Sequence, residues 1–238
     1  MQSKSKMSPV DIFLEKLLGA SEEIIKHEET VHWPGVAGLL VVGIANTFLS
    51  DSYHLLGQGW LVLIGIIVVI ALVAVLKRKG NHDLVHTILF SLCVLLVIFE
   101  IYNIFHLVIS LPDKTIPAPT LLVNAGILWT SNVIIFAYWY WTVEGGGPMK
   151  RSIMSTNVYH EQAELLFPQL TFLQQRPEFE RWRPGFLDYL FVAFNTSTAF
   201  SPTDTPVLSV RIKALSMLQS LLSLVTLATL AARAVNLL

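Results

Sequence analysis

The side chains with the clearest chemical potential lie in one polar stretch, "NTSTAFSPTD", at residues 195–204. Its hydroxyl groups belong to Thr196, Ser197, Thr198, Ser201 and Thr203. Its single carboxylate is Asp204. Polar groups that line a narrow membrane passage replace the water around an ion, and rings of acidic side chains attract cations. These residue types therefore indicate a constriction for cations, provided that the neighbouring elements hold the stretch inside a membrane.

A second set of polar residues interrupts a long apolar segment. Glu100, Asn103 and His106 recur every three residues, so all three lie near one face of a helix. An ionisable side chain in hydrocarbon is costly enough to be a candidate functional residue. One interpretation is proton relay or ion coordination, and the other is hydrogen bonding between neighbouring helices.

Composition assigns the chain to a class. Of its 238 residues, 53% are hydrophobic and only 14% are charged, and the mean hydropathy is +0.60. These values are typical of a multipass membrane protein, whose main partner is the lipid bilayer. The formal net charge of -1 gives no reason to expect a nucleic-acid partner. The single cysteine, Cys93, excludes an intrachain disulfide.

Hydropathy predicts an all-α membrane protein with about five transmembrane helices plus a re-entrant pore-type half-helix. The predicted spans are 34–50, 60–76, 86–111, 119–142 and 209–235. Five spans would place the two termini on opposite sides of the membrane. Residues 1–33 read as an amphipathic helix, which lies on the membrane surface or packs on the bundle.

The chain divides into an N-terminal three-span bundle at 34–112 and a second module at 119–238. A polar linker at 143–185 is too polar to span and is expected to form loops and short helices. The apolar run at 186–199 is about half the length needed to cross. Irregular backbone at membrane depth is tolerated only where protein buries it or where it lines a water-filled cavity. We therefore expect the polar stretch after this half-helix to face a pore or cavity.

The segment "DYLFVAFNTSTAFSPTDT" resembles the pore helix and selectivity filter of potassium channels. The residues at the positions of the TTVGYGD filter are Thr198, Ala199, Phe200, Ser201, Pro202, Thr203 and Asp204. The order of span, linker, short helix, filter-like turn at 200–205 and final span is also similar. This resemblance implies a two-span pore-loop module in a homo-oligomer, with a tetramer favoured.

The chain from residue 119 onward is also similar to a group of uncharacterised bacterial multipass membrane proteins. The shared patterns include "WTSNVIIFAYWYW", "EGGGP", "LLFPQ" and "QSLLSLVTLATLAARAVNLL". This similarity is specific to the family, but it implies no established function.

The departures from the channel pattern define the expected selectivity. Ser201 and Thr203 occupy the glycine positions of the potassium filter, and Pro202 has no N–H to donate. In a tetramer, four Asp204 side chains would form an acidic ring. We therefore expect a weakly selective cation pore without tight potassium selectivity, with monovalent cations in the pore and no other cofactor.

Other interpretations stay open. The segment "SPTD" could be a simple turn, with its hydroxyls bonded to the backbone and Asp204 paired with Arg211 or Lys213. A small transporter, or a non-conducting membrane subunit that acts as a sensor or scaffold, is the alternative function, although no inverted repeat is visible. Enzymatic activity is not expected, because no nucleophile, base and orienting group share a motif.

A metal site is not expected either, because His82 and His86 share a helix face without an evident third ligand.

The distribution of charge predicts an orientation in the cell membrane. One face carries the basic residues of the N-terminal arm, of the 77–79 loop and of the linker, together with Arg211 and Lys213, and only Lys114 and Arg233 fall on the other. The positive-inside rule places the first face, and with it the N-terminus, in the cytoplasm. Potassium channels have the opposite orientation, because their linker and the mouth of their filter face the outside of the cell. We favour entry of the pore loop from the cytoplasm, because the short 77–79 loop is where the rule works best.

Overall fold

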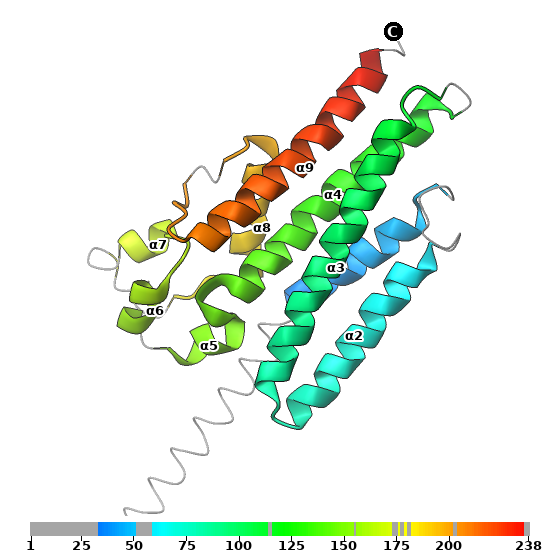
Figure 1. The fold of residues 1–238 in the computed structure, drawn as a ribbon. Coiled ribbons are helices and arrows are strands. Elements are labelled where there is room, and N and C mark those ends of the chain that lie inside the picture. Colours follow the sequence, from blue (N-terminus) through cyan, green and yellow to red (C-terminus); the bar gives the residue numbers. More distant parts are fainter. Residues whose placement is uncertain are drawn as a thin grey trace, which may run out of the picture.

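The protein is a bundle of long helices with a group of short helices at one end (Figure 1). The computed structural model describes residues 33–50, 59–113, 116–154, 156–172, 176, 179, 182–201 and 204–235. The predicted amphipathic segment at 1–33 lies outside these residues, apart from Trp33. Among the described residues there is no β-sheet, and a single bridge joins Leu165 to Val207. The predicted all-α class is confirmed.

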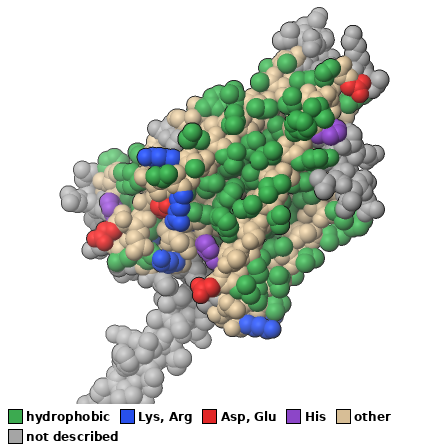
Figure 2. All heavy atoms as spheres, in the orientation of Figure 1, with side chains coloured by type: hydrophobic (Ala, Val, Ile, Leu, Met, Phe, Trp, Pro, Cys, Tyr) green, Lys and Arg blue, Asp and Glu red, His purple; other side chains and the backbone are tan. Residues whose placement is uncertain are grey.

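Four helices are long and apolar enough to cross a membrane. They are α2 (Trp60–Arg78), α3 (His82–Ile109), α4 (Ala118–Val143) and α9 (Val210–Val235). They correspond to four of the five predicted spans, and they indicate a multipass helical membrane protein. Figure 2 shows hydrophobic side chains covering the long helices on the visible face, with charged side chains mostly toward the ends.

The helix found at the first predicted span, 34–50, is shorter than predicted. Its described part is a shorter apolar helix, Trp33–Thr47, below the length expected for a span. The helix ends in a turn before Ser50, whose backbone N–H and hydroxyl contact the side chain of Asn124 on α4. These bonds hold the end of the helix against the start of α4.

Helix α4 is the centre of the bundle. It packs against α3 on one side and against α9 and the short helix α8 (Phe186–Thr198) on another, and it is the most buried of the four long helices. Helix α2 packs on α3 and is the least buried. Side chains of α4 such as Phe136, Tyr140 and Trp141 form much of the core.

Helices α3 and α4 run antiparallel. The rings of Phe90, near the start of α3, and Trp139, near the end of α4, have centroids 5.9 Å apart. His86 lies beside Gly147, just beyond the end of α4. The α2–α3 turn and the linker therefore lie at the same end of the bundle, which is called the linker end below.

The linker contains four short elements. They are η2 (Glu144–Gly146), α5 (Pro148–Ile153), α6 (Thr156–Gln162) and α7 (Pro168–Thr171). The three glycines of "EGGGP" have backbone φ values of 58°, 79° and 96°, which residues with a Cβ rarely adopt. This left-handed turn allows the chain to leave α4 and fold back over its end.

Candidate functional site

The predicted half-helix at 186–199 corresponds to α8, which has 13 residues. Its length is about 20 Å at the usual helical rise, shorter than the hydrocarbon core of a bilayer, about 30 Å. Its start is capped by Asp188, whose Oδ2 accepts a hydrogen bond from the backbone N–H of Gly185 at 2.7 Å. The carboxylate near the N-terminus also suits the helix dipole.

Helix α8 runs antiparallel to α4 and ends near the middle of it. At its start, the rings of Phe186 and Trp141 have centroids 5.9 Å apart, close to the linker end of α4. At its end, Ser197 lies beside Asn132, with Oγ and Oδ1 3.2 Å apart. Helix α8 therefore extends from the linker end to about half the depth of the bundle.

After α8 the chain returns to the end from which it came. The backbone N–H of Leu166 donates to the carbonyl of Pro206 at 3.0 Å, and that of Leu208 donates to the carbonyl of Glu164 at 2.8 Å. The guanidinium of Arg211 reaches the carbonyl of Val143 at 3.3 Å. Helix α9 thus begins beside the linker, and α8 with the turn after it forms a hairpin that enters the bundle and leaves at the same end (Figure 1).

The predicted filter residues divide into two groups. Thr196 and Ser197 have no exposed surface, and the Thr196 hydroxyl donates to the carbonyl of Val192 at 2.8 Å. Both side chains face the interior of the protomer. The residues exposed on the outside of the hairpin are Thr198, Ala199, Phe200, Ser201 and Asp204. Pro202 and Thr203 lie outside the described residues.

The turn has one unusual backbone conformation. Phe200 has a φ of 57°, in the left-handed region that a bulky residue seldom adopts. In the potassium-channel alignment this residue immediately precedes Ser201, which occupies a glycine position. The sequence pattern showed that Ser201 and Thr203 occupy glycine positions of the potassium filter, but it did not predict a left-handed backbone at Phe200.

One alternative for Asp204 is pairing with Arg211. In the structure Arg211 instead forms a two-pronged ion pair with Glu164 of the linker. The Asp204 side chain is exposed, and its Oδ1 accepts a long hydrogen bond from the hydroxyl of Thr205 at 3.5 Å. The carboxylate therefore lies on the outer surface of the hairpin.

A buried polar network joins α8 to both neighbouring spans. Gln219 of α9 accepts a hydrogen bond from the Tyr140 hydroxyl at 2.6 Å, and its amide donates to Ser197 at 2.9 Å and to the carbonyl of Ala193 at 2.8 Å. Asn132 of α4 accepts from Ser197 at 3.2 Å and from Ser223 at 2.9 Å. The sequence reasoning did not select Gln219 or Asn132, although amides inside apolar spans are a recognisable signal.

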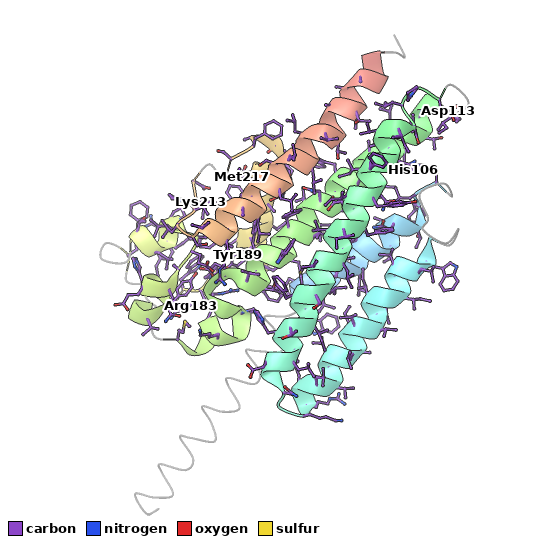
Figure 3. The ribbon with its side chains drawn as sticks, viewed as in Figure 1. His106, Asp113, Arg183, Tyr189, Lys213 and Met217 are labelled. Carbon is purple, nitrogen blue, oxygen red and sulfur yellow. The ribbon has the colours of Figure 1, made fainter. Side chains whose placement is uncertain are left out.

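The intramembrane residues Glu100, Asn103 and His106 do not form one cluster. Glu100 and Asn103 are buried, at 2% and 0% exposure, and Glu100 faces Asn132 of α4. His106 lies nearer the far end of α3, where its Nδ1 is 3.3 Å from the hydroxyl of Ser110. Figure 3 shows His106 and Asp113 at this far end, and Arg183 and Lys213 toward the linker end.

A buried ion pair holds the linker against the start of the hairpin. Glu144 and Arg151 are almost fully buried, with their side-chain atoms 3.4 Å apart. The carboxylate of Glu144 also accepts hydrogen bonds from the hydroxyl of Tyr189 on α8 at 2.8 Å and from the backbone N–H of Glu164 at 3.2 Å. Arg151 donates to the carbonyl of Trp141 at 2.9 Å. The sequence reasoning noted "EGGGP" only as a shared pattern and did not assign this role to its glutamate.

The second ion pair, at the same end, joins the largely buried Glu164 to the exposed Arg211. Partial burial works against ionisation of Glu164, but hydrogen bonds from Arg211 and Ser209 outweigh it and lower the pKa of the carboxyl group. The carboxylate is therefore ionised at neutral pH and holds the start of α9 against the linker.

No family model, curated protein or solved structure matches the chain. The described residues contain no group of three or more His, Cys, Asp or Glu side chains that could hold a metal ion. The functional interpretation therefore rests on the hairpin and on the buried polar groups around it.

Proposed function

We propose that the chain is a pore-loop subunit of a weakly selective cation channel. The observation that carries this proposal is the path of α8 and the following turn, which enter to half depth and return to the linker end. Such a re-entrant path would place non-helical backbone at membrane depth, where it is tolerated only if protein or a water-filled cavity surrounds it. An aqueous passage beside the turn supplies those surroundings.

The passage would lie between copies of the chain. Ser201 and Asp204 are exposed on the outside of a single protomer, so several hairpins arranged around an axis would bring their turns together. Four Asp204 carboxylates would then concentrate cations at the mouth. The resemblance to potassium channels supports a tetramer in preference to other oligomers.

Within this proposal, only some of the predicted hydroxyl residues line the passage, and the others stabilise the interior of the protomer. Ser201 contributes to the passage, together with backbone groups of the turn. Thr196 and Ser197 face the protomer interior, where Ser197 anchors the end of α8 to α4 and α9. The wall of the passage is thus less polar than the sequence pattern alone indicates, which supports weak selectivity.

The proposal is tested with purified protein in lipid vesicles, by measuring flux of potassium and sodium under imposed gradients. Asp204→Asn is expected to reduce cation flux most at low ionic strength, because salt screens the field of the carboxylates over a Debye length of about 10 Å at 0.1 M. The matched control is Asp83→Asn, which removes another exposed carboxylate at the same end of the bundle but away from the hairpin.

Two outcomes contradict the channel. One is a protein that remains monomeric in lipid by native mass spectrometry. The other is vesicles that pass no monovalent cation at any tested gradient or voltage. An Asp204→Asn variant that conducts like the unmodified protein at low salt would remove Asp204 from the mechanism and leave the pore.

A small transporter is the second candidate, and the buried Glu100 favours it. An intramembrane carboxyl group is a common element of proton-coupled transport. The same vesicles distinguish the two functions: a transporter requires a coupled substrate or proton gradient, whereas a channel passes cations down their own gradient. A sensor or scaffold subunit would show neither activity.

A further inference from the structure

Polar atoms without hydrogen-bond partners gather between α3 and α4, about midway along the bundle. Both carboxyl oxygens of Glu100 and both amide atoms of Asn103 are buried and make no hydrogen bond within the described structure. The side chains of Glu100 and Asn132 face each other across the helix interface, in a geometry that gives no regular hydrogen bond, and the Nδ2 of Asn132 is also unpartnered.

Buried polar groups are normally hydrogen-bonded, and each one left unpaired costs about 1 to 3 kcal/mol. Three such side chains in one place are therefore expected to bind a proton or a ligand in the working protein. We propose that Glu100, together with Asn103 and Asn132, forms a proton-binding site inside the membrane bundle. This proposal does not depend on the channel function.

The donor and acceptor types in this set fit a protonated carboxyl group. The set contains the NH₂ groups of Asn103 and Asn132, each with two N–H donors, and three oxygen acceptors, two from Glu100 and one from Asn103. An ionised carboxylate only accepts, whereas a protonated carboxyl group also donates one O–H. A protonated Glu100 can therefore accept from an amide N–H and also donate to the Asn103 oxygen.

The orientation of Asn132 fits a proton better than a metal cation. Its Oδ1 accepts from Ser197 and Ser223, so its NH₂ group is the part of the amide left to face Glu100. Hydrogen atoms directed at the carboxyl group would repel a metal cation bound there. They are the appropriate donors to a carboxyl oxygen.

No charged side chain from the packed helices is placed to neutralise Glu100. In the elements that pack on α3, residues 60–76 of α2, all of α4 and residues 214–232 of α9 contain no Asp, Glu, Lys, Arg or His. The other ionisable side chains on α3 and α4 are His82, Asp83, His86, Cys93, Tyr102, His106, Tyr138 and Tyr140. A proton is therefore the simplest means of removing the carboxylate charge, which is costly in these surroundings.

The site also contacts the hairpin network. Asn132 links Glu100 to Ser197 at the end of α8, and Ser197 in turn accepts from Gln219. A change in the charge of Glu100 would alter the field at Asn132 and therefore the bonds that hold α8 at its inner end.

Dicyclohexylcarbodiimide, an apolar reagent that reacts with protonated carboxyl groups, tests the site in the intact protein in lipid vesicles. The carboxyl proton passes to a carbodiimide nitrogen, the carboxylate oxygen adds to the central carbon, and the adduct rearranges to a stable N-acylurea. Peptide mass spectrometry is expected to find one adduct at Glu100 at acidic pH. Above the midpoint, the adduct should decrease about tenfold per pH unit, because the protonated fraction does so.

Three controls make the result specific. Glu100→Gln should abolish the adduct, and Glu144, which is buried but paired with Arg151, should stay unmodified. Replacing choline chloride with sodium chloride at constant ionic strength should not protect Glu100. Because the pH and sodium series use the unmodified protein, they remain decisive even if Glu100→Gln folds poorly.

The outcomes that overturn the proposal are distinct. An absence of adduct at every acidic pH, or an adduct that does not vary with pH, excludes a titrating site. Protection by sodium shows that Glu100 holds a sodium ion instead of a proton. None of these readouts requires ion flux, so failure of the channel proposal leaves the test unaffected.

Discussion

At the scale of single residues, the two ion pairs of the linker end differ in what they contribute. The Glu144–Arg151 pair is almost completely buried and is surrounded by hydrogen-bond partners from α4, α8 and the linker. In the Glu164–Arg211 pair the carboxylate is largely buried, but the arginine side chain is 57% exposed. A buried charge that loses its partner is far more costly than an exposed one. The buried pair therefore controls how the linker folds over α4.

The first prediction concerns Arg151. Arg151→Met should lower the free energy of unfolding by about 3 to 5 kcal/mol, because it leaves the Glu144 carboxylate buried without its cation. Lys150→Met, at the exposed neighbouring position, should have little effect. Unfolding curves in detergent micelles measure both. The double variant Glu144→Gln with Arg151→Met should recover part of the loss, and a double variant less stable than Arg151→Met alone would refute this account.

The second prediction uses the lowered pKa of Glu164. Because its folded-state pKa lies below the unfolded value of about 4.3, the ion pair stabilises the protein above that pH. The contribution is lost as the pH falls through the folded-state pKa. Glu164→Gln should therefore lower stability at neutral pH, by at most about 1 kcal/mol because Arg211 is largely exposed. This difference should vanish on acidification.

Unfolding measured from pH 7 down to pH 3 follows this change. Glu161→Gln, at an exposed position of the same segment, is the control and should show no comparable difference. A Glu164→Gln deficit that persists unchanged at the acidic end would mean that the ion pair is not its source.

At the scale of elements, the hairpin is held by side-chain bonds to two spans. Helix α8 is too short to cross a membrane, and its inner end is fixed through Ser197 to Asn132 of α4 and Gln219 of α9. Its outer end is fixed through Tyr189 to Glu144. The hairpin therefore depends on contacts with α4 and α9, since a helix of this length is marginal on its own.

The third prediction tests this anchoring at Gln219. Gln219→Leu removes the hydrogen bonds of Gln219 to the Tyr140 hydroxyl, to Ser197 and to the carbonyl of Ala193, and it should cost about 1 to 3 kcal/mol of stability. It should also speed proteolytic cleavage in the turn after α8, because the inner end of the helix is released. Met217→Leu, two residues away and 73% exposed, is the control on the same helix. Equal cleavage rates in the two variants would show that Gln219 does not hold the hairpin.

At the scale of the whole molecule, the antiparallel packing of α3 and α4 places basic residues at one end. The α2–α3 turn contributes Lys77, Arg78 and Lys79, and the linker contributes Lys150 and Arg151. Both short basic segments lie at the linker end, so the positive-inside rule predicts that this end faces the cytoplasm. The hairpin would then open toward the cytoplasm, in the orientation opposite to that of a potassium channel.

The fourth prediction tests this topology with single cysteines in a Cys93→Ser background. A membrane-impermeant thiol reagent applied to intact cells should label Asp113→Cys and leave Lys79→Cys and Lys150→Cys unlabelled until the cells are permeabilised. The structure requires Lys79 and Lys150 to behave alike, whatever the orientation. Labelling of both from outside would reverse the orientation, and different behaviour of the two would contradict the packing of α3 against α4.

The sequence by itself determined the class and the long elements of this protein. The spans α2, α3, α4 and α9 follow from the length of their apolar runs, because the bilayer sets that length without reference to any neighbour. The bounds of α8 were also visible in local signals, such as Pro184, Gly185 and Asp188 at its start. Tertiary structure decided which polar groups meet. Ser197 and Asn132 are 65 residues apart in the chain, and Tyr189 and Glu144 are 45 apart. Local spacing cannot encode such contacts, so only the packing of α8 between α4 and α9 turned Thr196 and Ser197 inward and left Ser201 and Asp204 outside.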